Sequence, residues 1–372
     1  MQDLHLDYPL TVAVAGATGY AGGEALRILA AHPNFEVTCV AGHSSAGKRL
    51  GEFTPHIPQL SSLTIEDTTP EVLSGHDVVI LALPHGASGA LAAQLEDVRI
   101  VIDLGADHRL ESAEAWQDFY GDGYCAPWTY ALPELITGGD ENFGFSYQRS
   151  HLSSAHRLAG PGCNVTAVTL AFQPALAAGL VNSQISAHAV VGYSGAGRKT
   201  GRVNLLASEA LGNATAYSVA GSHRHIPEIQ QNFAHAQGLD GQNYSAIQQY
   251  KLGFTPVLAP MSRGIMATVS AALSNKALEM SDEEIRSVYG KAYGNEFFIE
   301  LLPPTVLPAT ADVIGSNAAH IQVAVDRRAG LLYGFSAIDN LNRGTAGQAI
   351  QSLNIALGLP EDAGLTKIGV AP

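Results

Sequence analysis

The sequence has 372 residues, of which 46% are hydrophobic and 15% are charged. This length provides for two ordinary cores, and the composition excludes a disordered or coiled-coil chain. With 20 Lys and Arg against 34 Asp and Glu, the formal charge of −14 argues against a nucleic-acid partner, although a few local Arg side chains suffice for a small anion.

The first residues show no basic and apolar leader, and no apolar run in the chain reaches membrane-spanning length. The three cysteines, Cys39, Cys125 and Cys163, form no evident disulfide framework. Such cysteine usage is typical of a reducing compartment. The sequence therefore predicts a soluble cytoplasmic protein without a membrane partner.

Residues 11–15 and 37–41 are short apolar runs that predict two buried parallel strands. Between them lie a turn with G-x-x-G-x-x-G spacing and a helix that His32-Pro33 ends. Glycines let a ligand approach the backbone, and the helix N-terminus offers free N–H groups to a phosphate. The unit predicts a dinucleotide cradle, and an ordinary tight turn is the alternative.

The end of the second strand carries information about the cofactor. An NAD site usually has an acid there for the ribose 2′-hydroxyl. Here Ser44, Ser45, Lys48 and Arg49 follow the strand, and the first carboxylate is Glu52. Hydroxyls and cations favour a 2′-phosphate, so the segment predicts NADP(H). A solvated loop with two chance cations is the alternative.

Residues 77–83 and 98–104 predict further strands, each followed by a helical pattern. This alternation predicts a doubly wound parallel sheet whose ligands lie beyond the carboxyl ends of the strands. Arg109 follows the second of these strands, and its guanidinium can grip a phosphate or a carboxylate. An ordinary surface arginine is the alternative.

Cys163 follows Gly-Pro-Gly and precedes an apolar run in which Val165, Val168 and Phe172 repeat at helical spacing. The thiol is therefore expected at a helix N-terminus, where the dipole and free N–H groups favour a thiolate. The same groups can stabilise an oxyanion. The pattern predicts a nucleophile rather than a packing residue.

A nucleophilic thiol needs a proton partner. The segment "SHRHIPEI" places two histidines around an arginine, just before the predicted helix start at Pro227 and Glu228. An imidazole exchanges protons near neutral pH, and a nearby carboxylate can orient it. A structural histidine is the alternative. No Cys or His pair has zinc spacing, so no metal site is predicted.

The rest of the chain predicts a second sheet and a closing helix. Residues 185–193, 264–271, 320–325 and 331–338 are strand-like, and "VDRRAGLL" is a hairpin signal that joins the last two. Residues 344–357 predict a helix that returns to the first domain.

Several long motifs appear in the order of one known family: "GATGYAGGE", "DLGADHRL", "PWTYALPEL", "GPGCNVTAVTLAFQP", "SGAGR", "GSHRHIPEI", "APMSRGIMAT" and "DNLNRGTAGQAIQSLN". The chain resembles the N-acetyl-γ-glutamyl-phosphate reductases of arginine biosynthesis, which belong to a wider group with aspartate-semialdehyde dehydrogenase. The resemblance implies an α/β fold with a Rossmann-like NADP-binding domain over residues 1–162 and 340–372. An inserted α+β domain for catalysis and dimerisation would span residues 163–339, in a homodimer or homotetramer.

The resemblance also implies site residues. Cys163 would be the nucleophile and His223 the acid–base, supported by Glu228. Cofactor contacts would come from Gly16, Thr18, Gly19, Tyr20, Gly22, Ser44, Lys48, Asn340 and Gly347, with Ser44 and Lys48 on the 2′-phosphate and Asn340 on the nicotinamide amide. Arg109 and Arg263 would bind the phosphate and carboxylate of the substrate, in an order left open.

The implied reaction is NADPH-dependent reduction of N-acetyl-γ-glutamyl phosphate to N-acetylglutamate 5-semialdehyde through a Cys163 thioester, with release of phosphate. Two alternatives share this chemistry: the reductase of carrier-protein-bound aminoadipyl phosphate in lysine biosynthesis, and aspartate-semialdehyde dehydrogenase itself. A catalytically silent NADP-binding regulator is an alternative of another class, against which the intact Cys163, His223 and Glu228 argue.

The chain departs from the family pattern in three places. Position 108 is His where the family usually has an aromatic residue, so the loop "ADHR" is expected to be arranged differently. Position 164 is Asn where an aromatic residue is common, although Asn is frequent there in the semialdehyde-dehydrogenase relatives. Residues 136–156 exceed what the family needs and are expected to form a surface loop.

Overall fold

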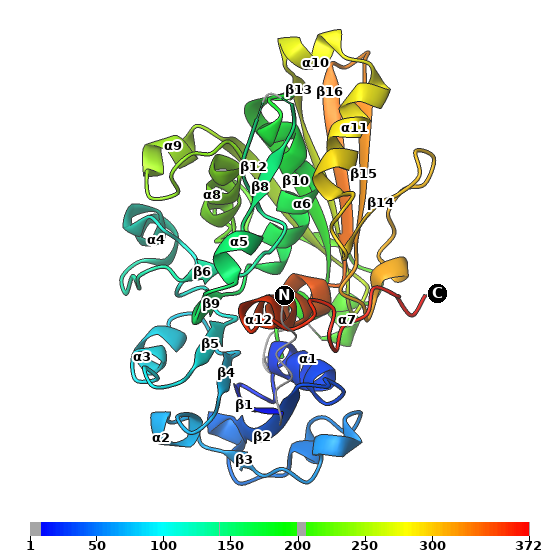
Figure 1. Cartoon of the computed structure of the whole chain (residues 1–372). Helices are drawn as coiled ribbons and strands as arrows, with labels where there is room; N and C mark the ends of the chain where they lie inside the picture. Colours follow the sequence, from blue (N-terminus) through cyan, green and yellow to red (C-terminus); the bar gives the residue numbers. More distant parts are fainter. Residues whose placement is uncertain (1–8, 141, 199–205, 372) are drawn as a thin grey trace.

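The computed structural model describes residues 9–140, 142–198 and 206–371. Residues 1–8, on which the prediction of no leader segment mostly depends, lie outside the described residues. Two seven-stranded sheets organise the chain, one in each half of the molecule, with helix α12 (Gly347–Ala356) between them (Figure 1). No helix in the described part of the chain combines the length and apolarity that a membrane span requires.

The first sheet has the order β3-β2-β1-β4-β5-β9-β6, and its neighbouring strands run parallel. Its strands are β1 (Leu10–Ala15), β2 (Phe35–Ala41), β3 (Ile65–Glu66), β4 (Val78–Leu81), β5 (Ile100–Asp103), β6 (Thr129–Tyr130) and β9 (Arg157–Ala159). The order reverses at β1, which has β2 on one side and β4 on the other. This reversal creates the crevice at which doubly wound sheets bind ligands. The predicted Rossmann-like sheet is confirmed.

The helices of this half include α1 (Tyr20–Leu29), α2 (Pro70–Leu73), α3 (Ser88–Ala92) and α4 (Ala113–Tyr120). The predicted closing helix is α12, preceded by a π-helical turn over Asn342–Ala346. Buried Ile350 and Leu353 of α12 pack with Leu26 and Leu29 of α1 in one apolar core. The end of the chain therefore returns to the first sheet, as predicted.

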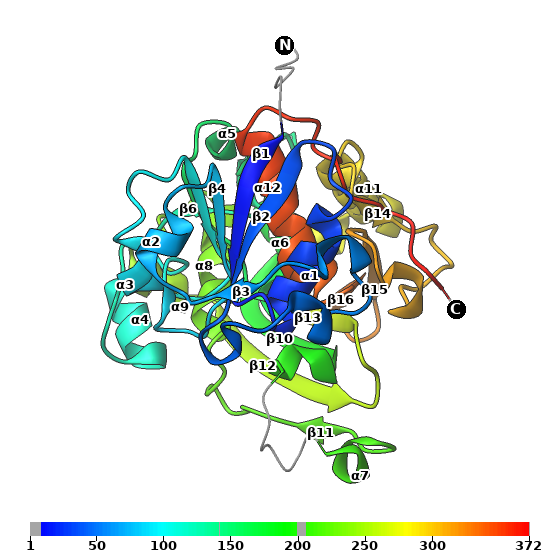
Figure 2. The same ribbon diagram turned by 90° about the horizontal axis from the view of Figure 1, so that it is seen from below.

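The second sheet is mixed, with the order β11-β12-β10-β13-β16-β15-β14. Its strands are β10 (Val181–Gly192), β11 (Thr215–Ala216), β12 (Lys251–Ala259), β13 (Ile265–Leu273), β14 (Ile299–Leu301), β15 (Ala319–Asp326) and β16 (Leu331–Ile338). Strand β10 is parallel to β12 and antiparallel to β13, and the predicted hairpin joins β15 to β16. Seen from below, β11 and α7 (Ala207–Ala210) project from the body of the molecule (Figure 2).

One face of the second sheet is covered by helices, of which α6 (Cys163–Ala177) is the most deeply buried. This half also contains α8 (Ile226–Ala236), α9 (Tyr244–Gln248), α10 (Asn275–Glu279) and α11 (Asp282–Tyr293). Along β10 buried side chains alternate with exposed ones, so the opposite face of the sheet is open in the single chain.

Most of the described residues in 136–156 lie at least partly at the surface, as predicted, but the prediction that they form a loop is wrong. Strands β7 (Ile136–Gly139) and β8 (Phe145–Tyr147) form a hairpin, and helix α5 (Arg149–Leu152) follows. Ile136 is buried, its N–H donates to Gln173 of α6 at 3.0 Å, and the Tyr147 hydroxyl donates to the Ala292 carbonyl at 2.8 Å. These contacts tie the hairpin to the helical layer of the second sheet. The domain boundaries at residues 162/163 and 339/340 stay a prediction.

Candidate active site

A cleft of about 740 Å³ lies beyond the carboxyl ends of the first sheet and is lined by residues of both halves. Eight of the residues singled out in the sequence line it: Gly16, Thr18, Gly19, Tyr20, Ser44, Arg109, Cys163 and Asn340. Six others lie behind its walls or outside it: Gly22, Lys48, His223, Glu228, Arg263 and Gly347. The cleft therefore joins the glycine-rich turn and the cysteine in one space.

The glycine-rich turn needs glycine at two positions because neighbouring backbone atoms leave no room for a side chain. Gly16 has φ of 79°, and a Cβ there would lie 2.2 Å from the Ala82 carbonyl oxygen. A Cβ on Gly22 would lie 2.3 Å from the Gly16 carbonyl oxygen, so Gly22 serves the packing of α1 against the turn rather than the cleft surface. Helix α1 begins after Gly19 without a side-chain cap or an acid in its first turn. These features fit a dinucleotide phosphate.

The part of the cleft next to the end of β2 differs from the prediction at one residue. Ser44 lines the cleft within the 3₁₀ turn His43–Ser45. The Lys48 ammonium instead lies 5.8 Å from the centre of the Phe53 ring. A cation from the other half, Arg198, lines the cleft in its place. The family motif "SGAGR" contained this residue, but its side chain was given no role.

Cys163 is the first residue of α6 and is partly exposed. Cys163 packs closely against Gly344, where a Cβ would lie 2.8 Å from the Cys163 Cβ. Burial raises the pKa of the thiol to about 11, although the N–H groups of residues 163 and 164 and the Arg109 charge pull the pKa down. The expected helix-terminus effect is present, but in the free chain it is outweighed by desolvation.

The two histidines of "SHRH" occupy different places. His225 lines the cleft next to Gly162, where a Cβ would lie 2.6 Å from the His225 Nε2. His223 lies behind it, with ring centres 4.7 Å apart, and its Nδ1 accepts the His225 backbone N–H at 3.0 Å. Burial lowers the pKa of His223 to about 4 and that of His225 well below its ordinary value. Both rings are therefore neutral at physiological pH.

Glu228 does not support His223 as expected. Its Oε1 accepts from the Tyr130 hydroxyl at 2.7 Å and from the Gly162 N–H at 3.0 Å. Its Oε2 lies 3.4 Å from the Arg109 Nη1, and both side chains are buried. Pro227 and Glu228 lie in the first turn of α8, so this carboxylate anchors the Gly-Pro-Gly turn before Cys163 and holds Arg109.

The two candidate arginines also differ. Arg109 lines the cleft near Cys163, and its Nε has no hydrogen-bond partner among the described residues. Arg263 is engaged elsewhere, with Nη2 at 2.8 Å from Glu24 and Nε at 3.1 Å from Asp339. The arrangement therefore favours Arg109 as the residue that binds an anion. Arg263 has a structural role, because its ion pairs hold it against two carboxylates.

Asn340 and Gly347 were predicted near the cofactor. Asn340 lines the cleft, and its amide donates to the Ser194 hydroxyl at 2.9 Å while accepting the Gly264 N–H at 2.8 Å. Gly347 lies behind the wall, where a Cβ would lie 1.9 Å from the Asn342 Oδ1. Its small size is therefore explained by packing.

Two departures from the family pattern have structural accounts. The His108 ring stacks on Trp128 with centres 3.8 Å apart, and its Nδ1 lies 2.8 Å from the Ala126 carbonyl, so a flat ring still fills the position. Asn164 is buried beside Cys163, and its Oδ1 has no hydrogen-bond partner in the described part of the chain.

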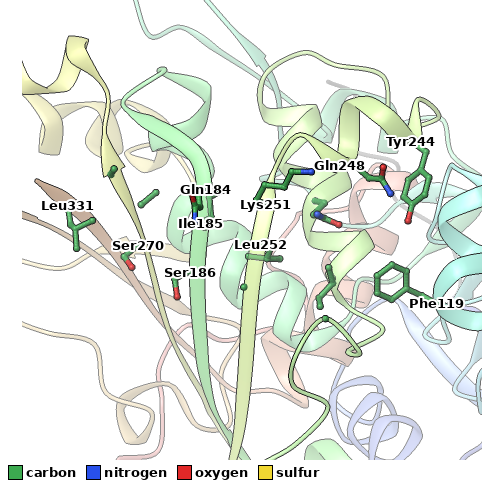
Figure 3. A pocket seen from close by; sticks show the side chains of 16 residues that line it. Phe119, Gln184, Ile185, Ser186, Tyr244, Gln248, Lys251, Leu252, Ser270 and Leu331 are labelled. Atoms are coloured by element: carbon green, nitrogen blue, oxygen red, sulfur yellow. The ribbon is translucent and has the colours of Figure 1, made fainter.

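A second groove lies at the far end of the second sheet (Figure 3). Phe119, Tyr244 and Leu252 line one side, and Ser186 and Ser270 the other. Its described lining contains no cysteine, histidine or arginine. The groove therefore lacks the groups for acyl transfer, which gather in the first cleft.

The sequence matches two family models. The one described as "Semialdehyde dehydrogenase, NAD binding domain" matches residues 11–138. The one described as "Semialdehyde dehydrogenase, dimerisation domain" matches residues 163–340.

Curated relatives match over nearly the whole chain. An N-acetyl-gamma-glutamyl-phosphate reductase of Bifidobacterium longum (strain DJO10A) is 66% identical over 97% of this chain and 99% of its own length. Another, from Streptomyces avermitilis, is 48% identical over the same shares.

Solved structures show the same fold at low identity. Aspartate semialdehyde dehydrogenase II of Vibrio cholerae, complexed with ASA, has a TM-score of 0.65 at 14% identity and covers 94% of this chain and 98% of its own. The enzyme of Candida albicans with NADP has a TM-score of 0.63 at 15% identity, over 93% and 98%.

Proposed function

The chain belongs to the N-acetyl-γ-glutamyl-phosphate reductase family, and we propose that it reduces N-acetyl-γ-glutamyl phosphate to N-acetylglutamate 5-semialdehyde with NADPH. The observation that carries the proposal is that Cys163 opens into the same cleft as the glycine-rich turn. The 66% identity to a reductase of that name supports this substrate over the aminoadipyl and aspartyl alternatives. Phosphate is the second product, and the reaction belongs to arginine biosynthesis.

The cofactor supplies hydride when it is bound. Gly16, Thr18, Gly19 and Tyr20 would hold its phosphates, because the N–H groups at the start of α1 have no side-chain cap. Asn340 would lie near the nicotinamide. Its amide is already fixed by Ser194 and by the Gly264 N–H, which would leave it a defined orientation.

The chain's own residues would activate the acyl group. As the Cys163 sulfur attacks the acyl carbon, the imidazole of His225 would take the thiol proton, so that a C–S bond forms and the C–O bond to phosphate breaks. The thioester would be the acceptor for the hydride that the cofactor supplies. Collapse of the thiohemiacetal on Cys163 would then release the aldehyde, and the sulfur would take back its proton from the imidazolium. Because both rings are neutral at physiological pH, the imidazole can donate a proton only after it has received one from Cys163.

Arg109 would bind an anionic group of the substrate. Its guanidinium lies in the cleft near Cys163, and its Nε is without a partner among the described residues. Glu228 would position both Arg109 and the Gly162 N–H at the turn before Cys163, since it contacts both.

A second copy of the chain would cover the open face of the second sheet. Val190 is 40% exposed at the centre of this sheet, and its neighbours across the strands are Val257 and Met266. The match of this half to a dimerisation domain supports the proposal. Val190→Lys should shift the mass measured by light scattering toward one chain, and an unchanged oligomer mass would exclude this face.

We propose a cytoplasmic location, because three free cysteines are typical of a reducing compartment.

The decisive assay is the reverse reaction. Phosphate-dependent reduction of NADP⁺ should proceed with N-acetylglutamate semialdehyde and be at least about 10²-fold slower with aspartate semialdehyde, since the pocket must recognise the acetamido group. Equal rates, or rates without phosphate, would refute the assignment. NADP⁺ binding without any turnover would favour a silent regulator.

A further inference from the structure

Arg198 lines the cleft, but none of the roles described above involves its guanidinium. It comes from the segment after the 3₁₀ turn Tyr193–Ala196 in the second half of the chain. It nevertheless lines the dinucleotide end of the cleft, together with Thr18 and Ser44 of the first half.

The contacts of Arg198 leave its charge uncompensated. Its Nη1 donates to the carbonyl oxygens of Thr18 and Phe53, both at 3.3 Å. These are long hydrogen bonds to neutral groups, and no carboxylate pairs with Arg198 among the residues the structure describes. The other arginine of the described cleft lining, Arg109, is paired with Glu228.

The Thr18 carbonyl, which accepts from Arg198, belongs to the glycine-rich turn, and this turn lies next to the end of β2, where the ribose of a dinucleotide is bound in this fold. A Cβ placed on Gly42 would lie 3.9 Å from the Thr18 Oγ1 and 2.7 Å from the Ser45 Oγ. The glycine-rich turn and the 3₁₀ turn after β2 therefore meet at Gly42. Because Arg198 donates to the Thr18 carbonyl, its guanidinium is close to both turns.

We propose that Arg198 is the cation that binds the 2′-phosphate of NADP(H), reaching it from the opposite half of the chain. The proposal rests on the proposed function, because it names a ligand contact within the same cleft. A planar guanidinium binds two phosphate oxygens at once, and such charged hydrogen bonds are short and strong. In a chain of formal charge −14, a cation that has no carboxylate partner among the described residues is an electrostatic anchor for an anion.

The test is calorimetric titration with NADP⁺ and with NAD⁺, in the absence of the acyl substrate. Arg198→Gln should weaken NADP⁺ binding by about 10- to 100-fold and NAD⁺ binding by less than about threefold, because only NADP⁺ carries the 2′-phosphate. Arg198→Lys keeps the charge but loses the planar fork, so it should show a smaller loss for NADP⁺ alone. Arg328→Gln, at the exposed β15–β16 turn, removes an equal charge and should bind both nucleotides as the parent does.

The outcomes separate this proposal from the function. Equal losses for NADP⁺ and NAD⁺, or unchanged NADP⁺ binding in both Arg198 variants, would overturn the role of Arg198 while leaving the reductase assignment intact. The same holds if Lys48→Gln loses NADP⁺ affinity and Arg198→Gln keeps it. A parent protein that binds no NADP⁺ would instead overturn the proposed function.

Discussion

At the scale of single residues, the thiol of Cys163 is subject to two opposing effects. The N–H groups at the start of α6 and the Arg109 charge favour the thiolate, while burial favours the thiol. Burial prevails in the free chain, which raises the pKa of Cys163 to about 11. The free enzyme therefore holds its nucleophile protonated, and a neighbouring imidazole has to accept the proton as substrate reacts.

This balance predicts slow alkylation at neutral pH. The rate of iodoacetamide labelling at Cys163, read by peptide mass spectrometry, should rise about tenfold per pH unit between pH 7 and 9, because only the thiolate reacts. The sign follows from the raised pKa, since each unit of pH below it removes nine-tenths of the thiolate. A rate that is already constant at pH 7 would show that the helix terminus, not burial, controls the thiol. Cys163→Ser identifies the labelled peptide.

A second prediction at this scale concerns the two histidines. Because His225 lines the cleft and His223 lies behind it, His225→Asn should lower kcat by about 10²- to 10⁴-fold, the usual contribution of general acid–base catalysis. His223→Asn should lower kcat less, since its Nδ1 contact with the His225 N–H is positional. Steady-state kinetics of both variants test this, and a larger loss at His223 would restore the role expected from the sequence.

Some residue roles follow from local sequence and others do not. Cys163 was predictable because its setting, a sharp turn and a helix start, lies within a few residues of it. The partners of Glu228 were not, because Tyr130, Gly162 and Arg109 come from three distant segments that only the folded chain brings together. Which of His223 and His225 faces the cleft depends on the geometry of the turn that carries them. The sequence does not show this, because both residues are histidines.

At the scale of elements, the close packing of the turn between β1 and α1 predicts that an alanine at Gly16 destabilises the fold more than an alanine at Gly47, which lies outside this turn. Gly16 and Gly47 both have left-handed φ angles, 79° and 82°, but only Gly16 has atoms close to where a Cβ would lie. Gly47→Ala should cost about 1–2 kcal/mol from backbone strain alone. Gly16→Ala adds a clash with the Ala82 carbonyl, so it should cost more and abolish NADP⁺ binding.

Urea unfolding of both variants, with NADP⁺ titration, measures these effects. The Gly47 variant is the matched control, because it has the same backbone conformation without close neighbours. Equal unfolding free energies for the two variants would mean that the contact with Ala82 relaxes at no cost.

The elements that the sequence predicted best are those buried on both faces. β1, β4 and β5 are nearly continuous apolar runs, and a parallel sheet covered by helices requires this pattern. β12 was missed because Gly253 and Pro256 interrupt it, although Pro256 is paired with Ala189 of β10. The sequence of the β7–β8 hairpin predicts a loop, because its glycines resemble a turn cluster and its apolar anchors, such as Ile136, are few.

At the scale of the whole molecule, a buried polar network joins the two halves of the chain. Arg343 and Glu134 are fully buried and 2.6 Å apart, and Gln351 of α12 donates to both Glu134 and Glu361. Arg149 of α5 pairs with Glu361 and with Glu296, which lies just after α11. The network therefore connects the hairpin region, the returning C-terminal helix and the second-sheet layer.

Glu296 makes this network sensitive to pH. Its side chain is 7% exposed, and burial together with the Glu134 charge raises its pKa to about 7, against the attraction of Arg149. A carboxyl whose pKa is higher in the folded than in the unfolded chain holds its proton more tightly when folded. Its contribution to stability is therefore full below its unfolded pKa of 4.5 and is lost as the pH rises through about 7.

Glu296→Gln should remove this dependence, because the amide does not titrate. The unfolding free energy of the parent, from urea titrations at pH 5, 6, 7 and 8, should fall relative to that of the variant by up to about 3 kcal/mol over this range. Glu300→Gln, an exposed carboxylate on β14, is the control and should keep the slope of the parent. If the Glu296 variant and the parent keep parallel slopes, Arg149 compensates the charge of Glu296 fully, and the two halves of the molecule are joined by a link that does not respond to protons in this range.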